Sequence, residues 1–304
     1  MEGYRIPIAF VIFNRPDTTE KVFAEIKKVK PAKLYLISDA ARKDKEGEQE
    51  KVEACRKLVE EGIDWECELH KNYAEQNMGC KERMASGITW FFEHVDMGVI
   101  LEDDIVPSPD FFPYMEIMLT KYKNVRRVMM VTGTNLMKKS PFTMPYTFSC
   151  FPSVWGWGSW KRAWRFYDKE IVDWPVIRAN GDFKKVQNGL AYRFLVQDMN
   201  RVYYHQKDTW DHQWDFARFK HRGLGIIPRE NLVNNIGFDR ADATHTTGAT
   251  QEDFSYGTTM NMEELKAYET EVFRDVIYDK AYIIKNFGMG KVMNFIKKKL
   301  TGKK

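Results

Sequence analysis

Three carboxylates stand next to one another at Glu102, Asp103 and Asp104. A short apolar run, residues 98–101, comes directly before them and is typical of a buried strand. Like charges this close raise one another's pKa, so the cluster is costly unless a cation neutralises it. Mg²⁺ and Mn²⁺ take oxygen ligands, often one or two protein carboxylates completed by phosphate and water. The triplet therefore predicts a site where Mn²⁺ or Mg²⁺ meets a phosphorylated ligand.

The direction of each of these side chains follows from the strand. Residues two apart share a side of a strand, so Glu102 and Asp104 are expected to face a cleft together, while Asp103 points elsewhere unless the chain turns. The alternative is an acidic turn or a helix N-cap, because residues 107–110 lead into the next helix. The apolar strand before the triplet favours the metal site.

Strands and helices alternate along the first half of the chain. Apolar runs predict strands at residues 6–13, 34–37, 66–70, 98–101 and 127–131. Between them, apolar residues recur at helical spacing, and Asp17 and Glu20 form a capping pair at the start of the first helix. The alternation predicts an α/β fold with a Rossmann-like mixed, mainly parallel sheet flanked by helices.

Polar residues gather where these strands end. Parallel sheets bind ligands just beyond the carboxyl ends of their strands. A rim made only of turns would more often use Gly, Asn, Pro and Ser than carboxylates and an arginine. The polar segments, which are expected to form one functional rim, are Asn14 with Arg15, Ser38 with Asp39, Glu102 to Asp104, and Asn135.

Aromatic residues dominate the next part of the chain. Seven of the nine tryptophans lie between Trp155 and Trp214. At this density they can build walls that stack on sugar rings or bases, or they can fill a core, and the two interpretations carry equal weight. Trp155 and Trp157 stand beside glycines that would let the backbone approach a ligand, so these two are the expected floor of a sugar site.

Composition excludes several classes of protein. A hydrophobic content of 43% supports a folded core, and no apolar run approaches the roughly 20 residues of a membrane helix. The formal charge of +4 is small for 304 residues, and lysines alternate with acids, which argues against a nucleic-acid partner. The four cysteines lack metal-ligand or disulfide spacing. A cytoplasmic protein with reduced thiols is expected.

Residues 291–304 are an exception to this balance of charge. The apolar residues Val292, Phe295, Ile296 and Leu300 recur there at helical spacing, and six lysines occupy other positions. Such a basic amphipathic helix could rest on an anionic bilayer, which would place the protein at the inner face of a membrane. It could equally dock on its own domain.

One segment resembles a known family. Residues 102–112, an acidic triplet followed by Pro-Asp-Phe-Phe, resemble the metal-binding segment of the GT-A glycosyltransferases related to the N-acetylglucosaminyltransferase that initiates complex N-glycans. Small bacterial glycan-transferases of this type are similar as well. Further similarities follow in order over roughly residues 6–245, at residues 7–15, 38–39, 151–152, 156–158 and 210–211.

The resemblance implies a metal-dependent enzyme of GT-A fold that moves a sugar from a nucleotide-diphosphate donor, expected to be a UDP-sugar, to a glycan acceptor with inversion. It implies one catalytic domain over residues 1–290: about 1–147 for the nucleotide, about 148–250 for sugar and acceptor, and a helical part, 251–290. The residues it implies are Arg15 and Asp39 at the nucleotide base, Glu102 and Asp103 at the sugar and ribose, and Asp104 on the metal. Asn14, which precedes Arg15 in the same segment, is a further candidate for binding the donor.

Inverting transfer also needs a carboxylate that takes a proton from the acceptor hydroxyl. Asp211 is the first candidate and Asp215 the reserve, since residues four apart on a helix share a face. The family keeps two adjacent acids where this sequence has Asp-His-Gln between Trp210 and Trp214, and Asp211 could instead cap a helix. His245 is a further candidate ligand of the metal or diphosphate, with a structural histidine as the alternative.

Two other functions compete with this one. A sugar-phosphate nucleotidyltransferase has a similar sheet but needs a Gly-rich loop with a lysine or arginine after its first strand, and residues 14–17 are not such a loop. A non-enzymatic carbohydrate- or membrane-binding protein would use the tryptophans and the basic tail. Loss of metal-dependent nucleotide binding would favour this second alternative.

Overall fold

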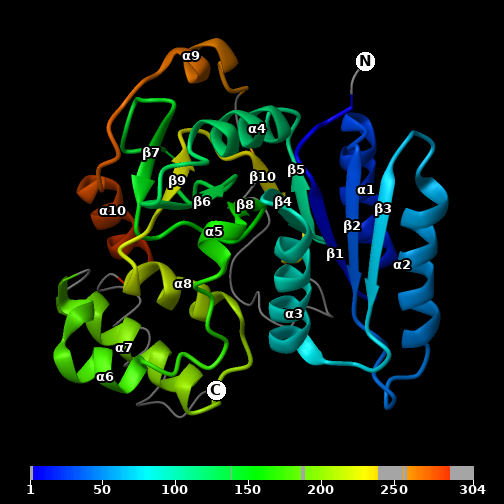
Figure 1. The fold of residues 1–304 in the computed structure, drawn as a ribbon, viewed down its shortest axis with the longest axis horizontal. Coiled ribbons are helices and arrows are strands. Elements are labelled where there is room, and N and C mark those ends of the chain that lie inside the picture. The colour runs from blue at the N-terminus through cyan, green and yellow to red at the C-terminus, as the bar shows by residue number, and fades with distance from the viewer. Residues whose placement is uncertain (1–2, 138, 186–188, 239–255, 257–258, 288–304) are drawn as a thin grey trace.

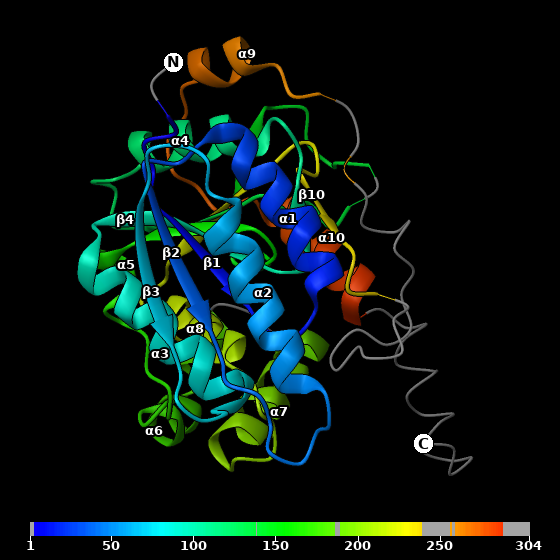
Figure 2. The same ribbon diagram turned by 90° about the vertical axis from the view of Figure 1, so that its right-hand side faces the viewer.

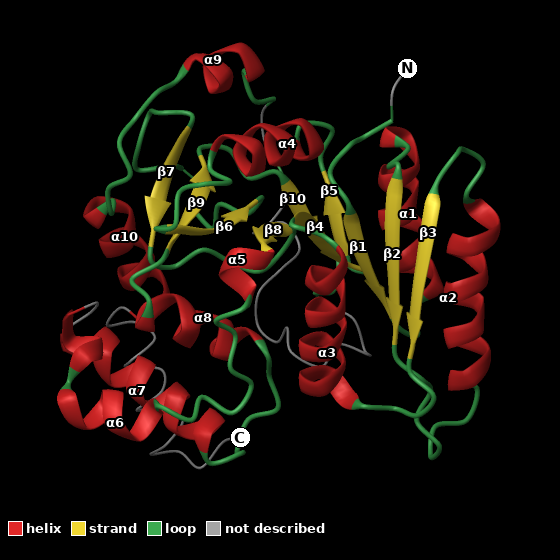
Figure 3. Ribbon diagram, viewed as in Figure 1, coloured by secondary structure: helices red, strands yellow, loops and turns green. Residues whose placement is uncertain are grey.

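A computed structural model describes residues 3–137, 139–185, 189–238, 256 and 259–287. Its centre is one eight-stranded sheet with helices packed against it (Figures 1 and 3). His245 and residues 291–304 lie outside the described residues. The strand order across the sheet is β3 (Glu68–Tyr73), β2 (Lys33–Ser38), β1 (Ile8–Ile12), β4 (Met97–Glu102), β8 (Trp157–Trp160), β6 (Val128–Thr132), β9 (Leu224–Pro228) and β7 (Tyr146–Ser149).

Most strands of this sheet point the same way. β2, β1 and β4 are parallel neighbours, and β3 is parallel to β2. β8 runs antiparallel to both β4 and β6, so β6 and its parallel neighbour β9 share the direction of β4. β7 is antiparallel to β9. The predicted α/β fold, with a mixed, mainly parallel sheet flanked by helices, is confirmed.

The helices cover both faces of the sheet. Figure 2 shows α1 and α2 side by side across one face of the first strands. In chain order the helices are α1 (Pro16–Val29), α2 (Glu48–Gly62), α3 (Gly79–His94), α4 (Phe111–Lys121), α5 (Lys161–Trp164), α6 (Trp174–Asn180), α7 (Gly189–Tyr203), α8 (Asp211–Lys220), α9 (Met262–Ala267) and α10 (Val276–Phe287).

Strand β1 shows how the sequence builds these layers. All five of its residues are buried, because helices cover the sheet on both sides. Successive side chains point to opposite faces, so Phe10 shares one core cluster with Val22 of α1, while Val11 shares another with Ile88 of α3. The alternation between two buried faces explains why the run is continuously apolar.

The first helix begins before the predicted capping pair. Pro16 occupies its first turn, where a missing N–H costs nothing and the fixed φ is already helical. Arg15 is the N-cap, without a side-chain cap bond, and Asp17 lies inside the first turn. The predicted capping box is therefore wrong, and Arg15 stands at the junction of strand and helix.

The tryptophans of the second half fill the core. Of the seven between Trp155 and Trp214, only Trp155 is more than 4% exposed. Trp157 is fully buried on β8 between two other strands, and its ring stacks on Trp210 with centroids 5.8 Å apart. A side chain enclosed in this way cannot stack on a sugar, so the role predicted for Trp157 is wrong.

The structure also contains strands that the sequence did not predict. These are β7, β8 and β9 of the main sheet and a small antiparallel pair, β5 (Ile105–Pro107) with β10 (Val233–Asn235). The small pair matters most for function, because β5 directly follows the acidic triplet. It joins the triplet to a segment more than a hundred residues away in sequence.

Two expectations from composition concern cysteines and membrane spans. All four cysteines are free thiols, as their spacing predicts. Among the described residues, no helix combines the length and the apolar character needed to cross a membrane.

Candidate active site

A pocket of about 460 Å³ opens at the carboxyl ends of the parallel strands. It collects residues that follow β1, β2, β3 and β4, as expected for an α/β sheet. Trp155 lines it from the second half of the chain. Six of the predicted site residues also line it: Asn14, Arg15, Asp39, Glu102, Asp103 and Asp104.

The acidic triplet lies where the chain leaves the sheet. β4 ends at Glu102, Asp103 and Asp104 form a turn, and β5 starts at Ile105. Because the chain turns, the strict alternation of a strand stops, and all three residues line the pocket. The turn thus allows Asp103 to face the pocket together with Glu102 and Asp104.

Asp103 ties this turn to the first strand. Its side chain is buried, and its Oδ2 accepts a hydrogen bond from the backbone N–H of Phe13 at 3.1 Å. A hydrogen bond to an ionised acceptor is stronger than one between neutral groups. The ends of β1 and β4 are thereby held together at the pocket.

Asp104 is held through both its side chain and its backbone. Its Oδ2 lies 3.3 Å from Nη1 of Arg15, and both side chains are at most 20% exposed. Its backbone carbonyl accepts a hydrogen bond from the N–H of Ile236 at 2.9 Å. Gly237 lies against the carboxylate, since a Cβ at that position would come 2.3 Å from Oδ2. The Asp104 carboxylate therefore has little room to move.

Glu102 is the most perturbed acid of the triplet. Burial raises the pKa of Glu102 well above its ordinary value. The carboxylates of Asp104, Asp103 and Asp211 raise this pKa further, and Arg15 lowers it by less than the others raise it. The triplet is therefore short of positive charge, which a cation bound in the pocket would supply.

The donor set fits a metal that is shared with a ligand. Among the described residues, no three His, Cys, Asp or Glu side chains are arranged to hold a metal by themselves. Mg²⁺ and Mn²⁺ often need only one or two protein carboxylates when phosphate oxygens and water complete the shell. Glu102 and Asp104 meet that requirement, because both line the pocket and remain partly exposed.

Asp39 organises the loop that follows β3. Its buried carboxylate accepts hydrogen bonds from the N–H groups of Ala40, Met78 and Gly79 at 2.9, 2.9 and 3.0 Å. The side-chain amide of Asn77 donates a further one at 3.2 Å. A carboxylate has about four lone-pair positions, so a nucleotide base would have to displace one of these donors. Asp39 therefore fits a positioning role better than the predicted direct contact with the base.

Asn14 belongs to a second network at the rim. Its side-chain amide donates to Oε1 of Glu48 at 2.8 Å. Hydrogen bonds from the side chain and backbone N–H of Arg42 are the main reason why the pKa of Glu48 falls to about 2. The guanidinium of Arg42 also lies 5.7 Å from the ring centre of Phe13. The network fixes Asn14 and Arg42, two lining residues, in place.

Asp211 lies beside the pocket at the start of α8. It is not among the lining residues, but its charge raises the pKa of two that are, Glu102 and Cys80. Trp210 occupies the N-cap position and Asp211 the first helical position. The alternative interpretation of Asp211 as the helix cap is therefore wrong.

The surroundings of Asp211 keep its carboxylate ionised. Burial is the largest single influence and raises its pKa, but the charge of His212, the Thr209 hydroxyl and Lys207 together bring the pKa below its usual range. Oδ1 accepts hydrogen bonds from the Thr209 hydroxyl and, at 2.9 Å, from the His212 backbone N–H. An oriented, ionised carboxylate of this kind can act as a general base.

Asp215 forms an ion pair with an arginine of the core. Its carboxylate pairs with Arg218, whose side chain is fully buried and also donates to the carbonyl of Cys150 at 3.0 Å. Burial raises the pKa of Asp215, and Arg218 offsets part of that rise. Asp215 therefore balances the charge of an arginine in the core, which does not suit its predicted role as the reserve base.

Several pocket residues were missed by the sequence analysis: Arg42, Asn77, Arg83, Asp208 and Asn235. Arg42 and Asn77 follow the ends of β2 and β3, so the rule that located Asp39 could have found them. Asp208 and Asn235 come from segments far away in sequence, and no pattern in the chain indicates that they return to this site. Trp155, one of the two predicted floor residues, does line the pocket.

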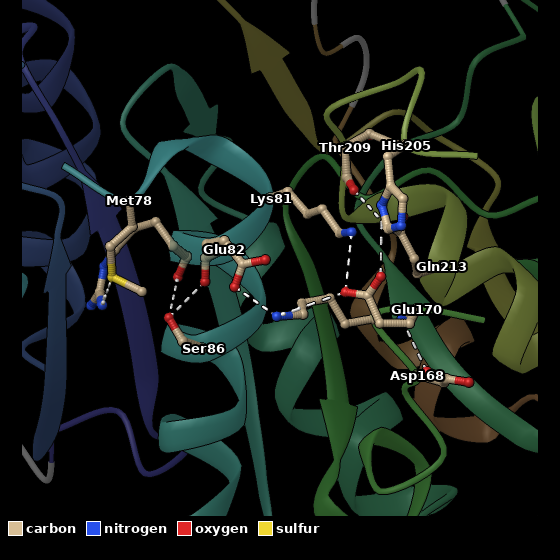
Figure 4. A network of polar contacts seen from close by, with 11 residues as sticks. Met78, Lys81, Glu82, Ser86, Asp168, Glu170, His205, Thr209 and Gln213 are labelled. Atoms are coloured by element: carbon tan, nitrogen blue, oxygen red, sulfur yellow. Dashed lines mark hydrogen bonds and ion pairs between the residues drawn. The ribbon is translucent and has the colours of Figure 1, made fainter. Parts of the chain in front are cut away.

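Charged side chains join α3 to the second half of the chain beside the pocket, as Figure 4 shows. Lys81 pairs with Glu170 at 3.3 Å, and Lys169 pairs with Glu82 at 2.8 Å. Partly exposed pairs of this kind contribute about 0.2–1 kcal/mol each. Because Cys80 precedes Lys81 in the pocket wall, these pairs help to fix the wall that α3 provides.

No family model matches this sequence, and neither does any curated protein. Among solved structures it is similar to mouse xyloside xylosyltransferase 1, with a TM-score of 0.37 and 11% identity over 73% of this chain and 84% of that one. A UDP-glucose pyrophosphorylase has a TM-score of 0.37 and 7% identity, over 75% and 93% of the two chains. 4-Diphosphocytidyl-2C-methyl-D-erythritol synthase from Anaerococcus prevotii has a TM-score of 0.34 and 11% identity, over 54% of this chain and 76% of that one.

These likenesses are too distant to carry an argument about function. The fold stands on the strand order and directions of the sheet itself. What the protein does is therefore argued from the residues of the pocket.

Proposed function

We propose that this protein is a metal-dependent glycosyltransferase that moves a sugar from a UDP-sugar donor to a glycan acceptor with inversion. The observation that carries the proposal is the pocket at the ends of β1 to β4, where three crowded carboxylates meet Arg15. A site with this charge pattern suits a divalent cation together with a diphosphate, because the cation relieves the repulsion among the acids and binds the phosphate oxygens.

In this proposal the donor occupies the pocket. Arg15 contacts the nucleotide, and Asn14 and Asp39 hold the surrounding loops in place through their hydrogen bonds. Trp155 offers a partly exposed aromatic ring at the pocket wall. The resemblance of the acidic segment supports assigning the sugar and ribose to Glu102 and Asp103.

Asp104 is the protein ligand that we propose for Mn²⁺ or Mg²⁺, with Glu102 beside it. The bound ion would neutralise the diphosphate as it leaves. Gly237 and Arg15 keep the Asp104 carboxylate in place at the pocket. His245, outside the described residues, remains a candidate second ligand.

Asp211 is the general base of the proposed reaction. It takes the proton of an acceptor hydroxyl while that oxygen attacks the anomeric carbon, and the bond from this carbon to the diphosphate breaks on the opposite face. Thr209 and His212 hold one of its oxygens, which fixes the orientation of the carboxylate. Its ionised state follows from its lowered pKa.

The structure does not favour the two competing functions. After β1 the chain enters α1 at Pro16, and Arg15 is paired with Asp104, so no Gly-rich phosphate loop stands where a nucleotidyltransferase needs one. The burial of six of the seven clustered tryptophans leaves little of the aromatic surface that a non-enzymatic carbohydrate-binding protein would use. Formation of UDP-sugar from UTP and a sugar phosphate would nevertheless identify the first rival directly.

We expect UDP to raise the melting temperature Tm only when Mn²⁺ or Mg²⁺ is present. A ligand that binds only the folded state, at a hundred times its Kd, adds about 2.7 kcal/mol of stability. Differential scanning fluorimetry with UDP, GDP and CDP, each with the metal or with excess chelator, measures this effect. An equal shift in chelator would refute the metal assignment, and a larger shift with GDP or CDP would change the expected donor.

Gly237→Ala should weaken the binding of UDP in the presence of Mn²⁺ by about tenfold or more. The added Cβ would meet the Asp104 carboxylate at 2.3 Å and the Asn235 side chain at 3.2 Å, so the acid must shift. Calorimetric titration of UDP with saturating Mn²⁺ measures the loss. The Tm of the ligand-free variant controls for general damage to the fold, and unchanged affinity would mean that the position of Asp104 is unimportant.

Arg15→Ala should raise the KM for the donor by about tenfold and leave kcat unchanged. The reason is that a contact to the nucleotide is the same in the ground state and the transition state, while Gly237 still confines the Asp104 carboxylate. Steady-state kinetics with a UDP-sugar measure both constants, and Arg15→Lys, which keeps the charge, is the matched control. A large fall in kcat at unchanged KM would show that Arg15 acts on the reacting centre instead.

A further inference from the structure

The outer face of α10 carries apolar side chains that are open to solvent in the described structure. Phe273, just before α10, and Val276, Ile277 and Ile284 of α10 are here together called the α10 stripe, and they are 41, 54, 66 and 72% exposed. Ile277 and Ile284 are two helical turns apart and share one side of the helix. Single exposed hydrophobic residues are ordinary, but these are four of the nine large ones exposed among the described residues. The stripe is therefore a candidate interaction surface.

Packing on its other side fixes the direction in which this helix faces. The buried Asp279 accepts hydrogen bonds from the Ser149 hydroxyl at 2.6 Å and from the Cys150 N–H at 3.3 Å. Tyr278, only 1% exposed, packs edge-on against Phe142 with ring centres 5.9 Å apart. α10 thus lies against β7 at the edge of the molecule (Figure 1), with the stripe turned outward.

Positive charge follows most of the stripe along the chain, whereas Arg274 and Lys280 are balanced by Asp275 and Asp279 between Phe273 and Ile284. From Lys280 to Lys304 the sequence contains eight lysines and neither Asp nor Glu, although the whole chain is nearly balanced with 47 basic and 43 acidic residues. Lys280 and Lys285 belong to α10 itself and are exposed. The other six lysines lie in residues 291–304, where apolar residues also recur at helical spacing.

A pocket of about 700 Å³ adjoins the beginning of α10, lined by four basic residues and by one acid, Asp182. Arg274 connects the two features, since it lines this pocket and directly follows Phe273 of the stripe. Carboxylates neutralise two of the basic lining residues, Arg274 and Lys220. Arg127 and Arg222 also line the pocket and are exposed. Arg127 and Arg222 thus place exposed cations near the start of the stripe.

We propose that the α10 stripe and the cations around it dock this protein on an anionic lipid bilayer. An amphipathic helix binds at the interface when its apolar side enters the boundary between headgroups and acyl chains and its lysines meet anionic headgroups. A bilayer is the favoured partner of the stripe because the 25 residues from Lys280 to Lys304 carry only positive charge, and attraction to anionic headgroups requires no matching shape. A second copy of this chain would carry the same positive charge and be repelled.

Vesicle sedimentation with the full chain tests the proposal. The protein should sediment with vesicles of equal parts phosphatidylcholine and phosphatidylglycerol, but not with phosphatidylcholine alone, and high salt should reduce the bound fraction. Ile277→Ser with Ile284→Ser should lower the partition coefficient by about tenfold or more. The matched control is Val172→Ser with Val176→Ser. Val172 lies just before α6 and Val176 lies in it, and they are 65 and 62% exposed.

Each contrary result overturns the docking assignment. Equal binding by the stripe variant would leave residues 288–304 alone as the membrane contact. Equal loss in the control variant would mean that the effect is not specific to α10. A fall in Tm of the stripe variant in solution would identify the protein's own chain as the occupant of the stripe. A dimer in light scattering that the stripe variant abolishes would identify a second copy.

Discussion

Replacement of Asp211 by asparagine is expected to lower the rate of sugar transfer by about 10²–10⁴ without loss of stability. Asparagine cannot take up the acceptor proton, but its side-chain oxygen can still accept the hydrogen bonds that Thr209 and His212 now donate to Oδ1. Nucleotide and metal binding should be close to normal, because Asp211 does not line the pocket and its charge raises the pKa of Glu102 less than burial, Asp104 and Asp103 do. Steady-state transfer rates, Tm and UDP affinity in Mn²⁺ measure the three properties on one preparation.

Asp215→Asn is the matched control for this prediction, since it makes the same chemical change four residues further along α8. It removes the charge partner of the fully buried Arg218, and breaking a buried pair in this way costs about 3–5 kcal/mol. The control should therefore lower Tm strongly, whereas Asp211→Asn should not. Near-parental turnover in Asp211→Asn, with turnover lost in a folded Asp215→Asn, would move the base to Asp215. Retained activity in both variants would refute the mechanism.

Asp104→Ala is expected to abolish the dependence of UDP binding on metal and to reduce transfer by more than about 100-fold. The remaining carboxylates would no longer provide the ligand that we assign to the cation. The ligand-free variant should stay close to the parental Tm, because loss of Asp104 relieves repulsion on Glu102 and removes one partly exposed pair with Arg15. Scanning fluorimetry with UDP and Mn²⁺, together with transfer assays, measures these effects.

Glu46→Ala, a change at an exposed acid outside the pocket, is the control for Asp104→Ala. It should leave both the metal dependence and the rate unchanged. If Asp104→Ala is instead much less stable without any ligand, the acidic triplet serves the fold. If it keeps a metal-dependent response to UDP, the cation is held elsewhere.

The sequence predicted β1, β2, β4 and β6 from their apolar runs but missed β7, β8 and β9, although every residue of these three strands is buried. β1 and β4 are almost wholly buried, so their hydrophobic runs end where the strands end. β3 was predicted about two residues too early, because its residues are half exposed and give no clear alternation. The strands β5 and β10 are only three residues long, and only their pairing with each other defines them.

The sequence located Asn14, Arg15, Asp39 and the three acids of the triplet in the pocket, because each lies just after an apolar run or in the triplet itself. A parallel sheet places the carboxyl ends of its neighbouring strands along one edge, so the strand-end rule carries information about the site. Trp157 was misjudged for the opposite reason. An aromatic residue has the same identity whether it faces a ligand or the core, and its burial depends on the strands that come to lie on either side of it.

The sequence by itself determined the α/β alternation, most of the rim of polar residues and the acidic triplet, since these follow from local periodicity and from charge next to an apolar strand. Asn135 of the predicted rim does not line the pocket, because its buried side chain donates to the carbonyls of Pro228 and Arg229. Only the tertiary structure decided how the carboxylates differ from one another. Arg15 pairs with Asp104, backbone donors surround Asp39, and Arg218 engages Asp215, whereas Asp211 remains oriented and ionised beside the pocket. These partners come from distant segments, and the charge state and role of a carboxylate depend on burial and neighbours, which local sequence does not specify.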